Sequence, residues 1–317
     1  MFHVEHSAKN GRGFQAQAHS LPSPKASLFG KPFLFFCTKQ LKSPPPVAIM
    51  GNCITVNHNF PKEAHPMAKI IAVVNQKGGV GKTTTTVNIT AALHELGKRV
   101  LLCDFDPQAN ATSGMGVDKN TASPNVYDLL VSDADPARAV VSTKYGDVLP
   151  SNKALAGAGI EMIGIEHREM LLKTALAGLD DRYDFIFIDC PPSLELLTVN
   201  ALCAAHSLLV PVQCEYFALE GLSDLLATVR LVKRKLNPNL VMEGVLLTMF
   251  DSRTNLSLQV AEEVKRHFPG QVYATVIPRN VRLSEAPSHG KPINAYDPFS
   301  RGAEAYKLLA EEMCGAV

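Results

Sequence analysis

The fold of this chain is decided by one segment, Asn75-Gln76-Lys77-Gly78-Gly79-Val80-Gly81-Lys82-Thr83-Thr84. An apolar run at residues 70–74 comes directly before it, and a stretch of helical character follows. A buried strand that enters a glycine loop and leaves it as a helix presents a nest of backbone N–H groups to an anion. The sequence therefore predicts a site for a nucleotide phosphate at this loop.

The loop matches the P-loop pattern Gly-x-x-x-x-Gly-Lys-Ser/Thr everywhere except at its first glycine, where Gln76 stands. We expect Lys82 to contact the β and γ phosphates and Thr83 to offer its hydroxyl to Mg²⁺. Neither task needs the second lysine, Lys77, which precedes the paired glycines. The departure from the strict pattern therefore indicates a further role for Lys77.

This segment resembles the deviant Walker A loop of the ParA/MinD group of ATPases. The alternative is a glycine-rich turn that binds nothing, which the preceding strand and the Gly-Lys-Thr-Thr ending disfavour. In that family the extra lysine reaches across a nucleotide-sandwich dimer to the partner's phosphates, and the resemblance gives this role to Lys77. The resemblance implies ATP and Mg²⁺ as cofactors. The nucleotide contacts that it implies are Lys77, Gly78, Gly79, Val80, Gly81, Lys82, Thr83 and Thr84.

The rest of the chain alternates between apolar runs and helical patterns. We expect strands at residues 70–75, 99–104, 185–189, 207–212, 241–249 and 272–277, and the main helices at 83–96, 127–131, 166–179, 194–204, 218–236, 256–268 and 300–313. The run at 185–189 is apolar on both faces, as in a parallel strand covered by helices on each side. The sequence thus predicts an α/β fold, a doubly wound, mostly parallel sheet with helices on both faces, over residues 67–317.

The first 66 residues carry no sustained helical or strand period and many prolines. They hold seven of the 31 Lys and Arg residues but two of the 30 Asp and Glu residues, so the remainder has 24 basic and 28 acidic residues. We expect residues 1–66 to be disordered or a mis-annotated extension, with Met67 as a natural start. A basic DNA-binding arm is the alternative.

Composition sets further limits. With 46% hydrophobic and 19% charged residues the chain is typical of globular proteins, and no apolar run nears the roughly 20 residues that span a bilayer. Its seven cysteines form no Cys-x-x-Cys pair, which favours a reducing cytoplasm. Since the part after residue 66 is acidic overall, any affinity for nucleic acid must come from a local patch.

Three aspartates follow predicted strands, at the edge of the sheet where ligands bind. Asp104 and Asp106 follow one strand, and Asp189 closes another as a Walker B acid that would hold Mg²⁺, directly or through water. A turn or helix cap is the structural alternative for each aspartate alone. Residues 104–112 resemble the family's switch I, which assigns Asp106 to the attacking water, so the expected catalytic residues are Lys77, Lys82 and Asp106.

Residues 189–200 resemble the family's switch II, and the segments 211–221 and 276–292 resemble the chromosomal partition ATPases ParA and Soj. The resemblance runs from about Met67 to the C-terminus. It implies an ATP-dependent homodimer that binds double-stranded DNA without sequence preference, and slow hydrolysis stimulated by a ParB-type centromere-binding protein. It assigns DNA contacts to Arg253 and Arg282 and adenine contacts to Pro278 and Asn280, and it implies a cytoplasmic, nucleoid-associated protein.

Three other functions share such a loop. A MinD-like membrane-cycling ATPase ends in a basic amphipathic helix, whereas residues 306–314 are acidic, so no stable membrane anchor is expected. An iron-protein type reductase needs cluster-binding cysteines, and Cys190 and Cys203 do not lie in that family's contexts. A P-loop metabolite kinase or ligase would need an acceptor pocket that no motif indicates.

The first six residues, Met1-Phe2-His3-Val4-Glu5-His6, permit the codons ATG TTC CAC GTG GAA CAT. These contain TGTTCCACGTGGAACA, a palindrome that resembles the parS site of ParB proteins. The hypothesis is that residues 1–66 are upstream DNA read as protein. The nucleotide sequence of the locus tests the palindrome, and mass spectrometry of the native N-terminus tests the start at Met67.

Overall fold

The computed structural model describes residues 67–216, 218 and 220–315. The predictions for residues 1–66 fall outside this part of the chain. Within it the sheet has the strand order β3-β4-β2-β5-β1-β6-β7, and every neighbouring pair is parallel except β3 and β4. The strands are β1 Lys69–Val73, β2 Val100–Asp104, β3 Val141–Thr143, β4 Gly146–Leu149, β5 Phe185–Asp189, β6 Ser207–Gln213 and β7 Val241–Thr248.

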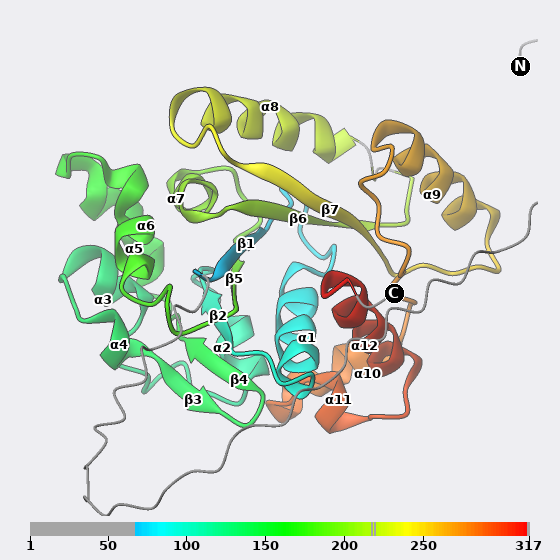
Figure 1. Cartoon of the computed structure of the whole chain (residues 1–317), viewed down its shortest axis with the longest axis horizontal. Helices are drawn as coiled ribbons and strands as arrows, with labels where there is room; N and C mark the ends of the chain where they lie inside the picture. The colour runs from blue at the N-terminus through cyan, green and yellow to red at the C-terminus, as the bar shows by residue number, and fades with distance from the viewer. Residues whose placement is uncertain (1–66, 217, 219, 316–317) are drawn as a thin grey trace, which may run out of the picture. The chain divides into compact units, whose positions relative to one another are not determined.

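Helices cover both faces of this sheet, which confirms the predicted doubly wound α/β architecture (Figure 1). The α-helices are α1 Lys82–Glu95, α2 Asn110–Gly114, α3 Val126–Val131, α4 Pro136–Ala139, α5 Leu155–Glu161, α6 Leu171–Ala177, α7 Leu196–Ala204, α8 Glu220–Lys235, α9 Asn255–His267, α10 Val281–Glu285, α11 Ile293–Tyr296 and α12 Arg301–Met313. Three 3-10 turns are η1 Met162–Gly164, η2 Arg168–Met170 and η3 Ala286–His289. None of the described helices is long and apolar enough to cross a membrane.

The central strand β1 shows why the sheet must be covered on both sides. Its side chains alternate, so Ile70 and Ala72 pack in one core with residues of α7 and α8. Ile71 and Val73 pack in the other core with α1 and α12. Figure 1 shows α7 and α8 on one side of β6 and β7, and α1 and α12 on the other. Because both faces are buried, the strand reads as one apolar run.

Two parts of the sheet differ from the prediction. Residues 141–149, for which no element was expected, form the antiparallel hairpin of β3 and β4 at one edge. The predicted strand at 272–277 forms only isolated bridges beside β7, Val245 with Val272 and Phe250 with Pro278. Between these bridges the backbone N–H groups of Ala274 and Thr275 donate to the carboxylate of Glu312, at 2.7 and 3.0 Å. A side chain of α12 thus accepts from the backbone between the two bridges, where residues 272–277 depart from a regular ladder.

Helix boundaries differ more modestly. The predicted helix at 166–179 is divided into η2 and α6, and His167 before it has a left-handed backbone with φ of 54°. The segments 107–125 and 154–164, which lie outside the predicted strands and helices, contain the short helices α2 and α5. Helices as short as these carry little periodic signal.

Candidate nucleotide and magnesium site

The predicted phosphate loop connects the central strand β1 to the start of α1 (Figure 1). Gly79 and Gly81 have φ of 76° and 93°, a backbone conformation in which a β-carbon is strained. A β-carbon built on Gly78 or Gly79 would meet no atom within 4 Å. The loop therefore turns its backbone toward open space at the N-terminus of α1, as an anion site requires.

Two anchors from neighbouring strands hold this loop in shape. The Asn75 side chain donates to the carbonyl of Pro211 in β6 at 2.8 Å and accepts from the backbone N–H of Lys77 at 3.0 Å. The hydroxyl of Thr248, the last residue of β7, donates to the carbonyl of Val80 at 2.8 Å. Sequence reasoning missed both anchors, because they depend on the pairing of β6 with β1 and of β7 with β6.

Lys82 is buried although it carries an ammonium group, with 7% of the residue exposed. Its Nζ donates to the carbonyl of Lys77 at 3.1 Å, so the lysine folds back over the loop. Burial lowers the pKa of Lys82, and the nearby carboxylate of Asp189 opposes that shift. Phosphate oxygens beside this buried amine would stabilise its charged form.

Thr83 and Asp189, the two predicted magnesium ligands, are brought together by the fold. The hydroxyl of Thr83 donates to Oδ2 of Asp189 at 2.7 Å, and the hydroxyl of Thr86 donates to Oδ1 at 3.1 Å. Asp189 is fully buried, and burial together with the Asp104 carboxylate raises its pKa. A hydroxyl and a carboxylate at the mouth of a phosphate loop are the hard oxygen donors that Mg²⁺ takes, so these residues fit the ion.

The two aspartates after β2 have separate surroundings. The carboxylate of Asp104 is wholly enclosed and accepts from the backbone N–H of Asp106 at 3.2 Å and from both the N–H and the hydroxyl of Thr112, each at 2.7 Å. Asp106 is also buried, with 9% of the residue exposed, and Oδ1 of its carboxylate accepts from the N–H of Gln108 at 2.9 Å. Asp104 thus organises the loop, and Asp106 keeps an oxygen for another partner.

A pocket of about 240 Å³ adjoins the phosphate loop. Pro278 and Asn280, the expected adenine contacts, line it together with Gly81, Thr84 and Met249. The Asn280 side chain also caps α10, because its Oδ1 accepts from the N–H of Arg282 at 2.8 Å. The structure therefore places the expected base contacts within the same site as the loop.

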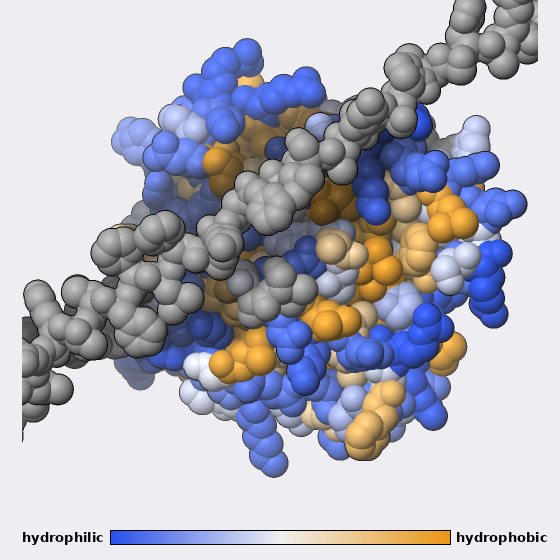
Figure 2. All heavy atoms as spheres, turned by 45° about the vertical axis from the view of Figure 1, so that its right-hand side comes forward, coloured by the Kyte–Doolittle hydropathy of each residue, from blue (hydrophilic) through white to orange (hydrophobic). Residues whose placement is uncertain are grey.

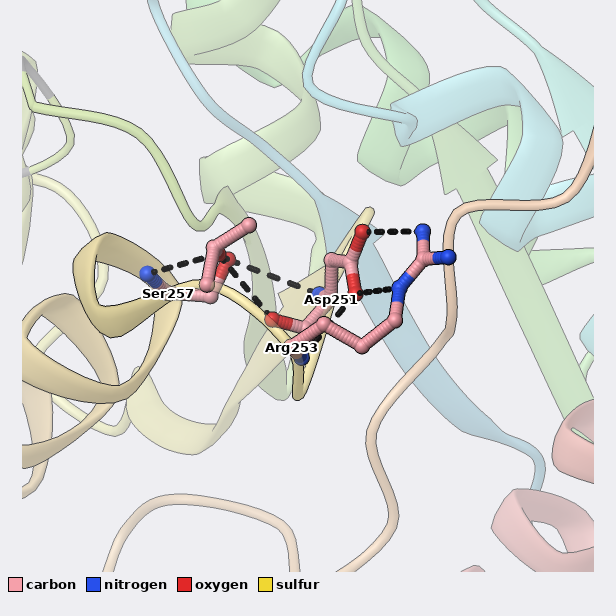
Figure 3. A network of polar contacts seen from close by, with 4 residues as sticks. Asp251, Arg253 and Ser257 are labelled. Carbon is pink, nitrogen blue, oxygen red and sulfur yellow. Dashed lines mark hydrogen bonds and ion pairs between the residues drawn. The ribbon is translucent and has the colours of Figure 1, made fainter.

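The first of the two expected DNA contacts, Arg253, lies at the opposite edge of the sheet from the β3–β4 hairpin. Arg253 follows β7, its side chain is 87% exposed, and its guanidinium pairs with Asp251 through bonds of 2.9 and 2.7 Å (Figure 3). Arg282 in α10 pairs with Glu285 at 2.8 Å and lies 3.4 Å from Asp297. Each arginine is thus exposed but partly neutralised by a carboxylate of its own chain.

The side of the molecule that carries α9 and α12 is drawn in Figure 2. Its visible margin is largely hydrophilic, and apolar residues gather toward its middle. The basic clusters at 233–235 and 265–267 are the last turns of α8 and α9. Cations there stabilise the helix C-terminus, which accounts for these clusters without a ligand.

Comparison with known proteins agrees with this geometry. Residues 68–242 match the family described as AAA domain. Over 249 residues the chain is 61% identical to the sporulation initiation inhibitor protein Soj of Bacillus subtilis, which covers 78% of this chain and 98% of that protein. It is 51% identical to the chromosome partitioning protein ParA of Myxococcus xanthus, with 78% and 88% covered.

Solved structures show the same fold. A Mycobacterium smegmatis structure described as cobyrinic acid a,c-diamide synthase with bound ADP and magnesium has a TM-score of 0.69 and 41% identity, with 78% of this chain and 94% of that chain covered. The septum site-determining protein MinD of Pyrococcus horikoshii, complexed with Mg-ADP, has a TM-score of 0.65 and 29% identity, with 78% and 96% covered. Taken with the identity to Soj and ParA over nearly their full lengths, this shows that the chain belongs to the ParA/Soj family of chromosome-partitioning ATPases, which hydrolyse ATP.

Proposed function

We propose that this chain binds ATP with Mg²⁺ at the loop of residues 77–84, dimerises around the nucleotide, and in that state binds double-stranded DNA without sequence preference. A ParB-type protein then stimulates hydrolysis, which releases the dimer from DNA. The proposal places the protein at the nucleoid in the cytoplasm. One observation carries it, namely the 2.7 Å approach of Thr83 to Asp189 beside the buried amine of Lys82.

The residue roles follow from that arrangement. Lys82 and the loop N–H groups hold the β and γ phosphates, while Thr83 and Asp189 hold Mg²⁺, Asp189 through water. Magnesium supplies charge neutralisation on the phosphates. Asp106 orients the attacking water, for which Oδ2 of its carboxylate is available, because within the described residues only Oδ1 accepts a hydrogen bond. Pro278 and Asn280 contact adenine.

Lys77 differs from Lys82 in the contacts of its ammonium group, since that of Lys82 donates to a backbone carbonyl of the loop. Among the described residues, the hydrogen bonds of Lys77 run through its backbone N–H and carbonyl. Its ammonium is therefore available for the phosphates of a second subunit, and the half-buried position leaves it near the surface. This supports the proposed trans role within a dimer.

DNA binding is assigned to Arg253 and Arg282. Guanidinium groups that bind phosphate release counterions, so the affinity should fall steeply as salt rises. The test is a binding titration of random-sequence duplex DNA with the purified protein in ATP, in ADP and without nucleotide. We expect tight binding in ATP alone. Equal binding in all three conditions, or preference for one DNA sequence, would contradict the proposal.

A further inference from the structure

A second layer of hydrogen bonds lies behind Asp106 and is not used by the proposed chemistry. It links the end of β2, the short helix α2 and the segment after β4 through two hydroxyl groups, those of Thr112 and Ser151. Both residues are fully buried. Because β2 and β4 are paired, with Cys103 opposite Leu149, the chain after β4 is brought beside the loop that carries Asp106.

The Thr112 hydroxyl has a defined direction in this network. It lies 3.0 Å from the backbone N of Ser151 and 2.7 Å from Oδ2 of Asp104. The Ser151 N–H can only donate, so it occupies an oxygen lone pair of Thr112. The single hydroxyl proton is then directed to Asp104. Thr112 therefore couples the β4 segment to the buried carboxylate, and removing its hydroxyl would remove both bonds.

The backbone of Asp106 is held on both of its sides by the same network. Its N–H donates to Oδ1 of Asp104 at 3.2 Å, the carboxylate that Thr112 holds. Its carbonyl accepts from the Ser151 hydroxyl at 2.9 Å and from the N–H of Ala109 at 2.9 Å. The backbone that carries the Asp106 side chain is thus held by groups at the end of β2, just before α2 and just after β4.

We propose that Thr112 and Ser151 are positioning residues for ATP hydrolysis, which act by holding the Asp106 carboxylate where it orients the attacking water. The inference rests on the proposed role of Asp106. Neither hydroxyl touches the nucleotide in this scheme. Loss of either should therefore slow the chemical step and leave ATP affinity nearly unchanged, because the loop, Lys82 and Thr83 are held by other contacts.

The decisive comparison uses two substitutions at one position. Thr112→Val keeps the shape of the side chain and removes the hydroxyl, whereas Thr112→Ser keeps the hydroxyl. We expect Thr112→Val to lower kcat by about tenfold to a hundredfold with the Kd for ATP changed less than about threefold, since small misplacements of reacting groups cost rates of this order. Thr112→Ser should recover most of the wild-type kcat.

Thr90 offers a matched control. It lies in α1, is fully buried like Thr112, and its hydroxyl has no hydrogen-bond partner among the described residues. Thr90→Val therefore makes the same chemical change at an equally buried site whose hydroxyl is bonded to neither Asp104 nor Asp106. We expect its kcat and its Kd for ATP to match those of the wild type.

Ser151→Ala makes the proposal testable even if Thr112→Val fails to fold, because it removes one of the two hydrogen bonds to the Asp106 carbonyl. We expect a smaller fall in kcat, again at constant ATP affinity. Wild-type kcat in Ser151→Ala and in folded Thr112→Val, with an inactive Asp106→Ala, would overturn the proposal and leave the role of Asp106 intact. If Asp106→Ala itself hydrolysed ATP normally, the proposed role of Asp106 would be wrong, and with it the positioning role.

Discussion

Lys82 and Asp106 lie in one site but face different parts of the proposed reaction. Lys82 is a buried amine that folds over the phosphate loop, and Asp106 is a carboxylate beyond the end of β2. A group that contacts the phosphates of the ground state contributes to binding, whereas a group that acts on the water contributes mainly to the rate. Substitution of each should therefore separate ATP affinity from turnover.

We expect Lys82→Ala to weaken ATP binding by about 2–5 kcal/mol, the usual cost of removing one partner from a buried charge pair. Asp106→Ala should keep ATP affinity and lower kcat by about 100-fold or more, the scale of a lost general base or water-orienting group. Calorimetric ATP titration and phosphate release measure the two quantities. Equal loss of ATP affinity in both variants would contradict the assignment.

The ion pair between Asp251 and Arg253 leads to the prediction of a variant that binds DNA more tightly than the wild type. Arg253 holds the pKa of Asp251 below its usual value, so the carboxylate is ionised at neutral pH and competes with DNA phosphate for the guanidinium (Figure 3). Asp251→Asn should therefore increase DNA affinity in the presence of ATP. Arg253→Ala should weaken binding to all sequences alike and reduce the salt slope by roughly one per subunit.

The control for this pair is Arg138, an exposed arginine of α4 near the β3–β4 hairpin at the far edge of the sheet. Arg138→Ala should leave both the affinity and the salt slope unchanged. Fluorescence anisotropy at several salt concentrations measures both. The double variant Asp251→Asn, Arg253→Ala completes the test. If it kept the increase in DNA affinity seen in Asp251→Asn, that increase would not act through Arg253.

Residues near one another in the sequence were the predictable ones. The loop at 77–84 carries a pattern whose spacing fixes its own geometry, and Asp189 could be found because it closes an apolar run. Asn75 and Thr248 could not be recognised, since their partners lie more than 100 residues away along the chain. Thr112 and Ser151 were missed because the hairpin that brings Ser151 to the loop was not predicted.

At the scale of elements, buried parallel strands were easier to predict than edges. The strands β1, β2, β5, β6 and β7 read as apolar runs because both faces of the central sheet are covered. The β3–β4 hairpin is short, and its turn at Lys144 and Tyr145 breaks the alternation. Residues 272–277 were read as a strand, but two of their backbone N–H groups, those of Ala274 and Thr275, donate to Glu312 of a distant helix rather than to β7.

Glu312 should therefore stabilise the segment 272–277 beside β7, and its neighbours in α12 should contribute less to this stability. Its two carboxylate oxygens accept from Ala274 and Thr275. Glu312→Ala should lower the free energy of unfolding by about 1 kcal/mol, the usual net value of such hydrogen bonds. Urea unfolding should show a lower midpoint with an unchanged slope.

Glu311 is the control, because it adjoins Glu312 in α12 and its side chain makes no hydrogen bond within the described residues. Glu311→Ala should leave the unfolding midpoint close to the wild-type value. If the two variants were equally stable, the Glu312 contacts would not hold the edge.

At the scale of the whole molecule, the proposed function depends on a second copy of the chain. Lys77→Ala should leave ADP affinity of the monomer nearly unchanged but impair ATP-dependent dimerisation and turnover, since the proposed partner of Lys77 is a phosphate in the other subunit. Analytical ultracentrifugation with ATP and with ADP measures this. A Lys77→Ala protein that dimerises with ATP and hydrolyses it normally would exclude the trans role.

The central claim is that ATP hydrolysis in this protein is a partner-controlled switch on DNA. The most direct measurement is the hydrolysis rate of the purified chain alone, with duplex DNA, with the ParB-type protein of the same organism, and with both. The account predicts a slow basal rate that rises most when DNA and the ParB-type protein are present together, and no rise in Asp106→Ala. A rate that these partners leave unchanged, and that a small-molecule acceptor increases, would contradict it.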